Sequence, residues 1–539
     1  MPKVADLKPV DKPSSYDEIP YPSHPFKQTH PERLYTIARL FGMDPTPPPE
    51  ARILEIGCAS GGNIIPLAEV LPDAQFVGID LSQRQVDEGA ERISELGFSN
   101  IRLQQADILE FQDTEGFDYI ICHGVYSWVP PQVQERIFEV CRDQLNPMGV
   151  AYVSYNTYPG WHMRESIRDM MCFHVDPIEG DEQKKIQQAR ALLQFLAESV
   201  DTQESAYGRM LRTELDMLSK QSDNYLYHEH LETFNDPVYF HEFMRRAGEF
   251  DLQYCADASL ASMWLGNLPK SVAQTLERIA PTMIQREQYV DFVRNRTFRQ
   301  SLLCHKSVKM NRSLDGKGVF DGFFSGKLGL RSGGDSVDLT AGVEVSFIDG
   351  KTKRTINSSD PITKAAIAHL NNAFPARISF TELFQASQLS VGSNTIQDAS
   401  QVEKDRYDLA SSLNHLLVMG MVDCSFFEDH FATKIASNPC ATKLSRYQAE
   451  HGASVTNLRH EIVTLDAFSS RVLMALDGQK NYDEIVSHIE ALVENGTLVV
   501  QIPEELNEEA KQLATRDLLQ QSVKKSLKSF LVHGLLQSV

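Results

Sequence analysis

Hydrophobic and polar positions alternate along residues 51–156 in a pattern that predicts strands and helices in turn. The segment SQRQVDEGAERISELG at 82–97 has apolar residues three and four positions apart, which predicts an amphipathic helix, with Ser82 placed to cap it. Helices between apolar strands are typical of a doubly wound, Rossmann-like α/β sheet. The expected strands are RILEIG at 52–57, QFVGIDL at 75–81, NIRLQQAD at 100–107, FDYIICHG at 117–124 and GVAYVSYN at 149–156.

The pattern changes after this region. Residues 161–305 have mainly helical periodicity, with an apolar run near 251–260 that predicts a strand able to complete the core sheet. Residues 360–539 contain a faint repeat of three helices, the last ending at a glycine before an apolar strand, which is typical of winged-helix-like modules. We expect an N-terminal arm at 1–50, the α/β core at 51–175, a mainly helical middle domain at 176–305, a first winged-helix-like module with preceding strands at 306–440 and a second module at 441–539.

The clearest chemical signal lies at the carboxyl ends of the first three expected strands. Gly57 stands where a strand turns into a helix, so backbone N–H groups can approach a ligand closely. Glu55, Asp80 and Asp107 end successive strands, where open α/β sheets bind ligands. These carboxylates suit the amino-acid end, the ribose hydroxyls and the adenine amino group of S-adenosylmethionine (AdoMet), with Ile108 against the adenine ring. The candidate cofactor-binding residues are Glu55, Gly57, Cys58, Gly61, Asn63, Asp80, Leu81, Asp107, Ile108 and His123.

With these motifs the chain resembles the class I AdoMet-dependent methyltransferases, with Ala59 where that family often has a glycine. In the class I fold, the end of the fourth strand faces the transferred methyl group. His123, Tyr126 and Trp128 stand there and are the candidate catalytic residues, offering a base, a hydrogen-bonding phenol and an aromatic wall. The alternatives are that the two aromatic residues pack in the core and that His123 only forms local hydrogen bonds.

A second aromatic block follows the fifth strand and is expected over the same rim. Aromatic walls suit an amine acceptor, because desolvation lowers the pKa of a lysine ammonium and aromatic faces attract the partly methylated cation. The candidate substrate-binding residues of this block are Tyr155, Asn156, Tyr158 and Trp161.

The wider pattern resembles the bacterial lysine methyltransferases of outer-membrane proteins, which carry a methyltransferase regulatory domain. This resemblance implies that the N-terminal arm closes the active site, with Tyr16 and Tyr21 as contacts, and that the middle and C-terminal domains present or select a protein substrate. The blocks that carry it include YDEIPYPSHPFKQTHPERL at 16–34, NTYPGWHMR at 156–164, YLYHEHLETFNDPVYFHEFMRRAG at 225–248, FRQSLLCH at 298–305 and VTNLRH at 455–460.

Composition excludes several other classes. With 52 Lys and Arg against 73 Asp and Glu, the net charge of −21 disfavours charge-driven binding of nucleic acid. No apolar run is long enough to span a membrane, and the eight cysteines are dispersed, which predicts a reduced, cytoplasmic protein. We expect no metal, because the histidine-rich HEHLE at 228–232 lacks the spacing that puts two ligands on one helical face.

We therefore expect a cytoplasmic AdoMet-dependent methyltransferase that modifies lysine side chains of a protein, with outer-membrane proteins as the class that the resemblance suggests. Two alternatives stay open: a small-molecule amine or hydroxyl acceptor, and a non-catalytic regulator that senses AdoMet. The sequence also leaves open the number of methyl groups added and the oligomeric state, a homodimer included.

Overall fold

A seven-stranded mixed sheet forms the centre of the computed structural model, which describes residues 23–201, 205–312, 316–334, 336–392, 398–499 and 508–538. The strand order is β3-β2-β1-β4-β5-β7-β6. The first five strands are parallel, and β7 runs antiparallel to both β5 and β6. The strands are β1 (Arg52–Ile56), β2 (Gln75–Asp80), β3 (Ile101–Gln105), β4 (Phe117–Cys122), β5 (Leu145–Asn156), β6 (Leu252–Asp257) and β7 (Phe298–His305). The expected doubly wound α/β fold is therefore confirmed.

Side-chain alternation along the central strands creates two separate cores, one on each face of the sheet. On β4, Tyr119 and Ile121 belong to one core, whereas Ile120 and Cys122 belong to the other. The first core is covered by α2 (Pro31–Leu40) and α3 (Ile64–Val70), and the second by α5 (Pro131–Gln144) and α10 (Phe240–Glu249). Helix α4 (Gln83–Leu96) packs beside β2 and β3, and the Ser82 side chain caps its N-terminus as expected, accepting from Gln85 N.

Strand β7 was not expected from periodicity, which indicated helices across most of 161–305. It lies between β5 and β6, and its Arg299 is fully buried. The Arg299 guanidinium donates from Nε to Asp291 Oδ2 (2.7 Å) and from Nη2 to Glu287 Oε2 (3.0 Å), both on α13 (Met283–Arg294). It also lies 3.8 Å from the ring centroid of Phe240. These contacts tie α13 and α10 to the edge of the sheet.

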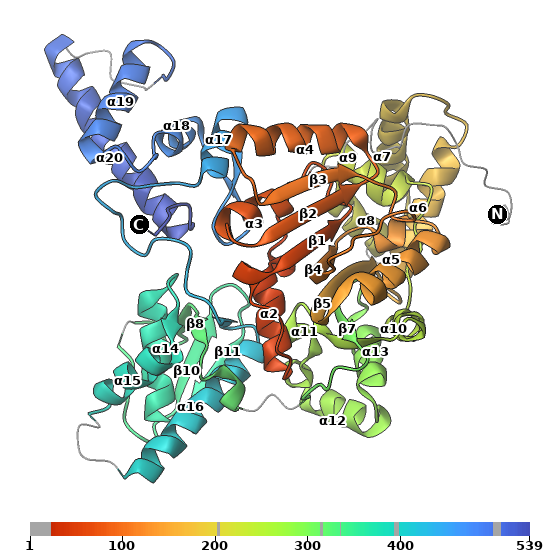
Figure 1. Ribbon diagram of the computed structural model, residues 1–539, viewed down its shortest axis with the longest axis horizontal. Coiled ribbons are helices and arrows are strands. Elements are labelled where there is room, and N and C mark those ends of the chain that lie inside the picture. Colours follow the sequence, from red (N-terminus) through yellow and green to blue (C-terminus); the bar gives the residue numbers. More distant parts are fainter. Residues whose placement is uncertain are drawn as a thin grey trace.

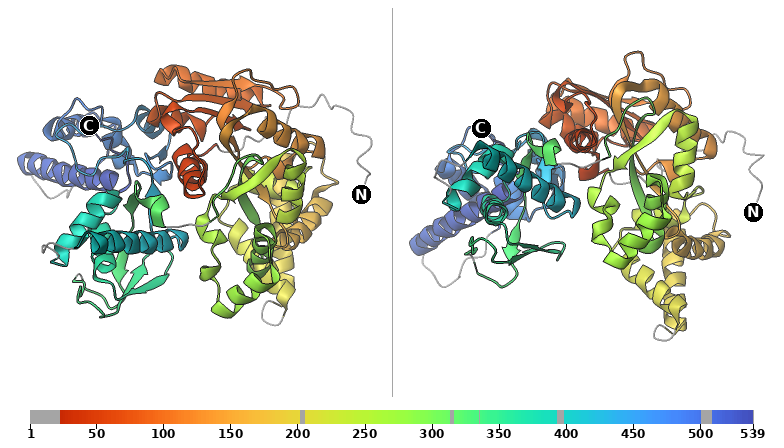
Figure 2. Two further views of the ribbon diagram at one scale, coloured as in Figure 1. Left: turned by 60° about the horizontal axis from the view of Figure 1, so that its bottom comes forward. Right: turned by 90° about the horizontal axis from the view of Figure 1, so that it is seen from below.

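A helical cluster with its own small core lies beyond β5. It consists of α6 (Trp161–Val175), α7 (Glu182–Ser199), α8 (Ala206–Leu218), α9 (Asp223–Leu226) and the π-helical turn η4 (Tyr227–Leu231). Figures 1 and 2 show this cluster on one side of the sheet and the C-terminal modules on the other. Helices α11 (Leu260–Met263) and α12 (Lys270–Ile279) connect β6 to α13.

The C-terminal half contains two modules with related helix order. The first module has three helices, α14 (Pro361–Ala373), α15 (Phe380–Ser390) and α16 (Ala399–Val418), which pack beside a small sheet of β8 (Phe323–Ser325), β12 (Ile378–Ser379) and β13 (Asp423–Ser425). A second small sheet consists of β9 (Leu328–Leu330), β10 (Val345–Asp349) and β11 (Thr355–Ser358). The second module has α17 (Lys443–His451), β14 (Ser454–Thr456), β15 (Ile462–Thr464), α18 (Ala467–Met474), α19 (Tyr482–Glu494) and α20 (Glu508–Val532). Helices α15 and α19 occupy corresponding places, and both begin with a capping box. No helix among the described residues is both long and apolar enough to cross a bilayer.

The buried ion pairs of β7 give a stability prediction. Replacing Arg299 with Ala removes the guanidinium that both the buried Asp291 and Glu287 carboxylates contact and leaves Arg296, 3.8 Å from Asp291, as the remaining cation beside them, which costs about 3–5 kcal/mol. We expect a large fall in the denaturation midpoint followed by circular dichroism. Arg245→Ala is the matched control, because Arg245 pairs with Glu249 on an exposed helix face and its loss leaves the midpoint nearly unchanged. Equal midpoints for the two variants would contradict this role of Arg299.

Candidate active site

The turn between β1 and α3 brings backbone N–H groups to the carboxyl edge of the sheet. Gly57 has a φ of +73°, and a Cβ atom there would lie 2.5 Å from Val125 Cγ2, so no larger residue fits. Ala59 takes a positive φ of 49°, which costs an L-residue about 1–2 kcal/mol, and its N–H donates to Asp80 Oδ2 (2.8 Å). Asp80 therefore holds the turn in place from the neighbouring strand. Gly61 also has a positive φ, and the Cys58 side chain is buried beneath the turn.

Glu55 is a buried carboxylate with one oxygen engaged and one unpaired. Its Oε1 accepts from Asn63 Nδ2 (2.7 Å), whereas Oε2 has no hydrogen-bond partner among the described residues. Burial is the main cause that raises the pKa of Glu55 to about 8; Asp80 raises it further, and the hydrogen bond from Asn63 lowers it. An unpaired, buried carboxylate oxygen at this edge suits a cationic group of a ligand.

The ends of β2 and β3 present an open, apolar surface beside two carboxylates. Leu81 is 60% exposed although it follows a buried strand, and Ile108 and the exposed Leu109 lie at the end of the next strand. Asp107 Oδ1 accepts from Leu109 N (2.9 Å), and β2 and β3 are paired up to Asp80 and Gln105. The structure thus brings the cofactor candidates of the first three strands together, and exposed leucine side chains beside carboxylates fit an adenosine group.

His123 ends β4 on the same face as α2. Its Nδ1 is hydrogen-bonded to the Tyr152 hydroxyl (2.9 Å), and the Phe26 ring lies on it with a centroid distance of 3.9 Å. Burial lowers the pKa of His123 to about 4. A base that weak holds a proton poorly at neutral pH, so the geometry favours a positioning role over the expected role of base.

Tyr126 and Tyr155 lie on the opposite face of the sheet, packed in the core against α5 and α10. The Tyr126 ring is fully buried and meets Tyr155 at 5.9 Å and Phe243 at 5.2 Å between centroids. The Tyr126 hydroxyl has no partner in the part of the chain that the structure describes, whereas the Tyr155 hydroxyl is hydrogen-bonded to Ser301 Oγ (3.0 Å). Their part in the acceptor site stays a prediction, and the structure favours packing.

The two aromatic blocks meet at Trp128 and Trp161. Their rings form an edge-to-face contact at 6.4 Å, Trp161 is buried, and Trp128 remains partly exposed. Tyr158 stacks on His162 at 3.9 Å and packs near Tyr239 at 5.3 Å. This group of Trp128, Tyr158, Trp161, His162 and Tyr239 is called the aromatic rim below.

Two residues beside the aromatic rim were missed by motif reasoning and come from the middle of the chain. Asn235 Oδ1 accepts from Asn156 Nδ2 (3.1 Å), and Asp236 N donates to Ser127 O (2.7 Å). The neighbouring Val238 forms a β-bridge with Thr157. Asn235 and Asp236 belong to the FNDP segment at 234–237. This segment lies within one of the sequence blocks that resemble the methyltransferase family, but the fold is needed to show that it packs at the end of β5.

The N-terminal segment that precedes α2 lies against the glycine-rich turn. Ser23 Oγ accepts from Gly62 N (2.7 Å), and a Cβ atom on Gly62 would lie 2.3 Å from the Ser23 carbonyl oxygen. The predicted contacts Tyr16 and Tyr21 lie outside the described residues, so they stay a prediction.

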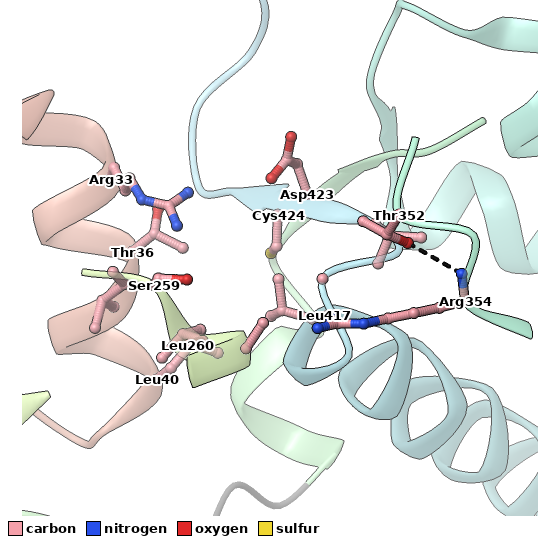
Figure 3. A pocket seen from close by; sticks show the side chains of 14 residues that line it. Arg33, Thr36, Leu40, Ser259, Leu260, Thr352, Arg354, Leu417, Asp423 and Cys424 are labelled. Atoms are coloured by element: carbon pink, nitrogen blue, oxygen red, sulfur yellow. Dashed lines mark hydrogen bonds between the residues drawn. The ribbon is translucent and has the colours of Figure 1, made fainter. Parts of the chain in front are cut away.

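Other features lie away from this edge. A cavity of about 340 Å³ lies between α2, α11 and the first C-terminal module, with Arg33 and Asp423 approaching it from different elements (Figure 3), and none of the candidate residues lines it. His228 and His230 are buried, and His228 Nδ1 is hydrogen-bonded to Glu232 (2.8 Å). Within the described ranges no three His, Cys, Asp or Glu side chains are grouped to hold a metal ion.

Three family models match the chain. Residues 48–214 match a "Methyltransferase domain", residues 222–305 a "Predicted methyltransferase regulatory domain", and residues 437–535 a "PKMT, C-terminal winged helix domain". Together they leave only the N-terminal segment and most of the first C-terminal module without a model.

Full-length relatives support the same organisation. The chain is 36% identical over 528 residues to an uncharacterised protein, RP789, of Rickettsia prowazekii, covering 95% of this chain and 92% of the relative. The solved structure of PKMT2 from Rickettsia typhi in complex with AdoHcy is 32% identical in sequence, with a TM-score of 0.83, and the match covers 96% of this chain and 100% of that one. A second uncharacterised Rickettsia prowazekii protein, RP028, is 44% identical over 234 residues, covering 43% of this chain and 93% of the relative.

The pKa of Glu55 predicts that cofactor binding depends on pH. At pH 7 a carboxyl with a pKa of about 8 is protonated in roughly nine of ten free molecules. On the prediction that the Glu55 carboxylate holds the ligand's ammonium, binding releases close to one proton, and affinity rises with pH by up to about tenfold per unit until about pH 8. Calorimetric titration with AdoHcy at several pH values, in two buffers of different ionisation enthalpy, measures the affinity and the number of protons released.

Glu55→Gln is the control for this prediction. It keeps an oxygen for the hydrogen bond from Asn63 but cannot ionise. We expect weaker binding whose pH dependence below pH 8 has disappeared. An unchanged proton release in this variant would assign the titration to another group.

Proposed function

The chain belongs to the class I AdoMet-dependent methyltransferases that carry a methyltransferase regulatory domain and a PKMT C-terminal winged helix domain, and we propose that its acceptor is a lysine side chain of a protein. The observation that carries the proposal is the likeness to PKMT2, which extends over both chains and includes the C-terminal modules. A small-molecule acceptor would give those modules no protein substrate to present or select. Outer-membrane proteins are the first acceptor class to test, from the sequence resemblance.

The cofactor end of the site uses residues of β1 to β4. AdoMet supplies an electrophilic methyl group on its sulfonium when bound. Glu55, oriented by Asn63, holds the amino-acid end, directly or through water, and Asp80 lies beside the ribose position. The exposed apolar side chain of Leu81 covers one face of the adenine. Alignment of the nucleophile with the methyl group and sulfur supplies a large part of the acceleration.

At the acceptor end, the aromatic rim serves an amine. A lysine ammonium has no lone pair, and its deprotonation at pH 7 costs about 4–5 kcal/mol from an ordinary pKa near 10.4. The partly exposed Trp128, packed edge-to-face on the buried Trp161, limits the access of water, which lowers the pKa of an entering ammonium, and its face attracts a methylated cation. Asn156, held by Asn235 at the end of β5, fixes the polar side of the entrance.

The acceptor class is tested by transfer of a labelled methyl group. AdoMet carrying the label is incubated with the protein and a fractionated bacterial extract, and protein precipitate and small-molecule supernatant are counted separately. We expect label in protein, on lysine side chains by mass spectrometry, with outer-membrane proteins among the labelled species. Asp80→Ala, which loses the ribose-side carboxylate, is the background control. Label confined to the supernatant would overturn the proposal.

The aromatic rim is tested by substitutions of two of the chain's three tryptophans. Trp128→Ala opens the acceptor end to water, so we expect methyl transfer to fall about tenfold or more while AdoHcy affinity stays unchanged. Trp264 is the matched control, since its ring packs against His415 of the first C-terminal module with 6.0 Å between centroids, and Trp264→Ala should keep transfer near the wild-type rate. A parallel loss of AdoHcy affinity in Trp128→Ala would place this side chain at the cofactor instead.

A further inference from the structure

A loop of the second C-terminal module reaches the glycine-rich turn of the core. His460 is 3% exposed, and its Nε2 lies 2.8 Å from Asn63 Oδ1. The two residues are almost four hundred positions apart in the sequence. The VTNLRH block at 455–460 was part of the family resemblance, but neither the methyl transfer nor the winged-helix order gives it a role.

The loop is built to present this histidine. Asn457 Oδ1 accepts from the N–H groups of Arg459 (2.9 Å) and Glu461 (2.8 Å), and its Nδ2 donates to the His533 carbonyl (2.8 Å) at the end of α20. His460 takes a φ of +60°, a conformation that L-residues rarely adopt without support. The turn is therefore anchored to the body of its own module, and the histidine projects from it.

Asn63 is where the loop, the N-terminal segment and the cofactor residues converge. Its Oδ1 accepts from His460, from Phe26 N (2.8 Å) and from Thr29 Oγ1 (3.1 Å). Its Nδ2 donates to Glu55 Oε1 (2.7 Å). The Thr29 hydroxyl shares its one proton with the Phe26 carbonyl oxygen (2.8 Å), so His460 and Phe26 N are the main donors, and they fix the amide with its nitrogen toward the carboxylate. Burial lowers the pKa of His460 well below its ordinary value, so the neutral ring donates from Nε2.

Other contacts hold the module against the core around this point. The Glu69 carboxylate, near the C-terminal end of α3, accepts from the N–H groups of Lys443 (2.6 Å) and Leu444 (3.0 Å) at the start of α17. Lys27 in the N-terminal segment pairs with Glu461 (3.4 Å), next to His460. Undocking of the module removes His460 from Asn63, because the loop is anchored to the module.

We propose that the second C-terminal module completes the AdoMet site, with His460 as a positioning residue that fixes Asn63 and, through it, the Glu55 carboxylate. Cofactor affinity and docking of the module are then linked, and the coupling is reciprocal: docking tightens cofactor binding, and bound cofactor holds the module in place. The inference concerns the cofactor alone and holds whichever acceptor the enzyme uses, so its failure is distinguishable from failure of the lysine proposal.

Calorimetric titration with AdoHcy on the full-length protein tests the positioning role. His460→Ala removes the donor to Asn63, and we expect about tenfold weaker binding. His460→Gln restores an N–H near the position of Nε2 and has the same backbone cost at positive φ, so it should return to within about threefold of the wild type. His488→Ala, on an exposed face of α19 in the same module, is the matched control and keeps wild-type affinity. Equal losses in the Ala and Gln variants, or no loss in either, would overturn the positioning role.

A second variant tests the linkage away from His460. Glu69→Ala removes the acceptor for α17 without touching the glycine-rich turn, so weaker docking should lower AdoHcy affinity by several-fold. Hydrogen exchange gives the reciprocal measurement: AdoHcy should slow exchange of the amides in 443–464 in the wild type and much less in His460→Ala. The coupling would be refuted if Glu69→Ala kept wild-type AdoHcy affinity and if amide exchange in 443–464 did not change with AdoHcy. A thermal melt of each variant shows that it is folded, so neither result reflects global unfolding.

Discussion

The hydrogen bond from the Asn63 amide to the Glu55 carboxylate is the interaction on which the cofactor site depends. Glu55 is buried at the end of β1, and its other oxygen is unpaired, so the orientation of the whole carboxylate rests on this bond. A buried carboxylate of this kind is costly unless a cation joins it, which is why burial raises its pKa. On the proposed role of Glu55, this cost of burial becomes binding energy when the ligand's ammonium pairs with the carboxylate. The free-energy cost of burying this carboxylate therefore favours binding of a cationic group, and the contacts that hold Asn63 determine how the carboxylate is oriented for it.

The cofactor half of the site could be predicted from sequence because its geometry is local. Glu55 and Asp80 lie at the ends of β1 and β2, and Asp107 follows β3; the alternation of apolar runs and helices predicts a parallel sheet, in which such carboxyl ends lie at one edge. Asn63 was also among the candidate cofactor residues. The groups that donate to Asn63 Oδ1 could not be predicted from the sequence, since two come from the N-terminal segment and one comes from the second C-terminal module.

The acceptor half was less predictable because two features were not visible in the sequence. One is the face of the sheet on which each candidate side chain lies, and the other is strand β7. His123 and Tyr126 are three positions apart, but the turn between them sends His123 to the α2 face and Tyr126 to the α5 face. Tyr155 follows Tyr126 into the second core, so the two blocks meet partly inside the core, at Tyr126 and Tyr155, and partly at Trp128 and Trp161. Strand β7 was hidden within a helical region, since FRQSLLCH mixes apolar residues with Arg299, Gln300 and Ser301 and shows no clear strand periodicity.

For the proposed lysine acceptor, the charges beside the aromatic rim are of both signs. The Glu165 carboxylate accepts from the Tyr158 hydroxyl (3.1 Å) and attracts an ammonium, whereas the Arg164 guanidinium lies 5.5 Å from the ring centroid of the buried Trp161. Trp128 remains partly exposed, and His123 at the end of β4 is held neutral by burial. Under the proposal, desolvation against Trp128 disfavours the charged amine, so its proton passes to solvent water before the nitrogen attacks the methyl group, and no strong base is needed at the reacting nitrogen.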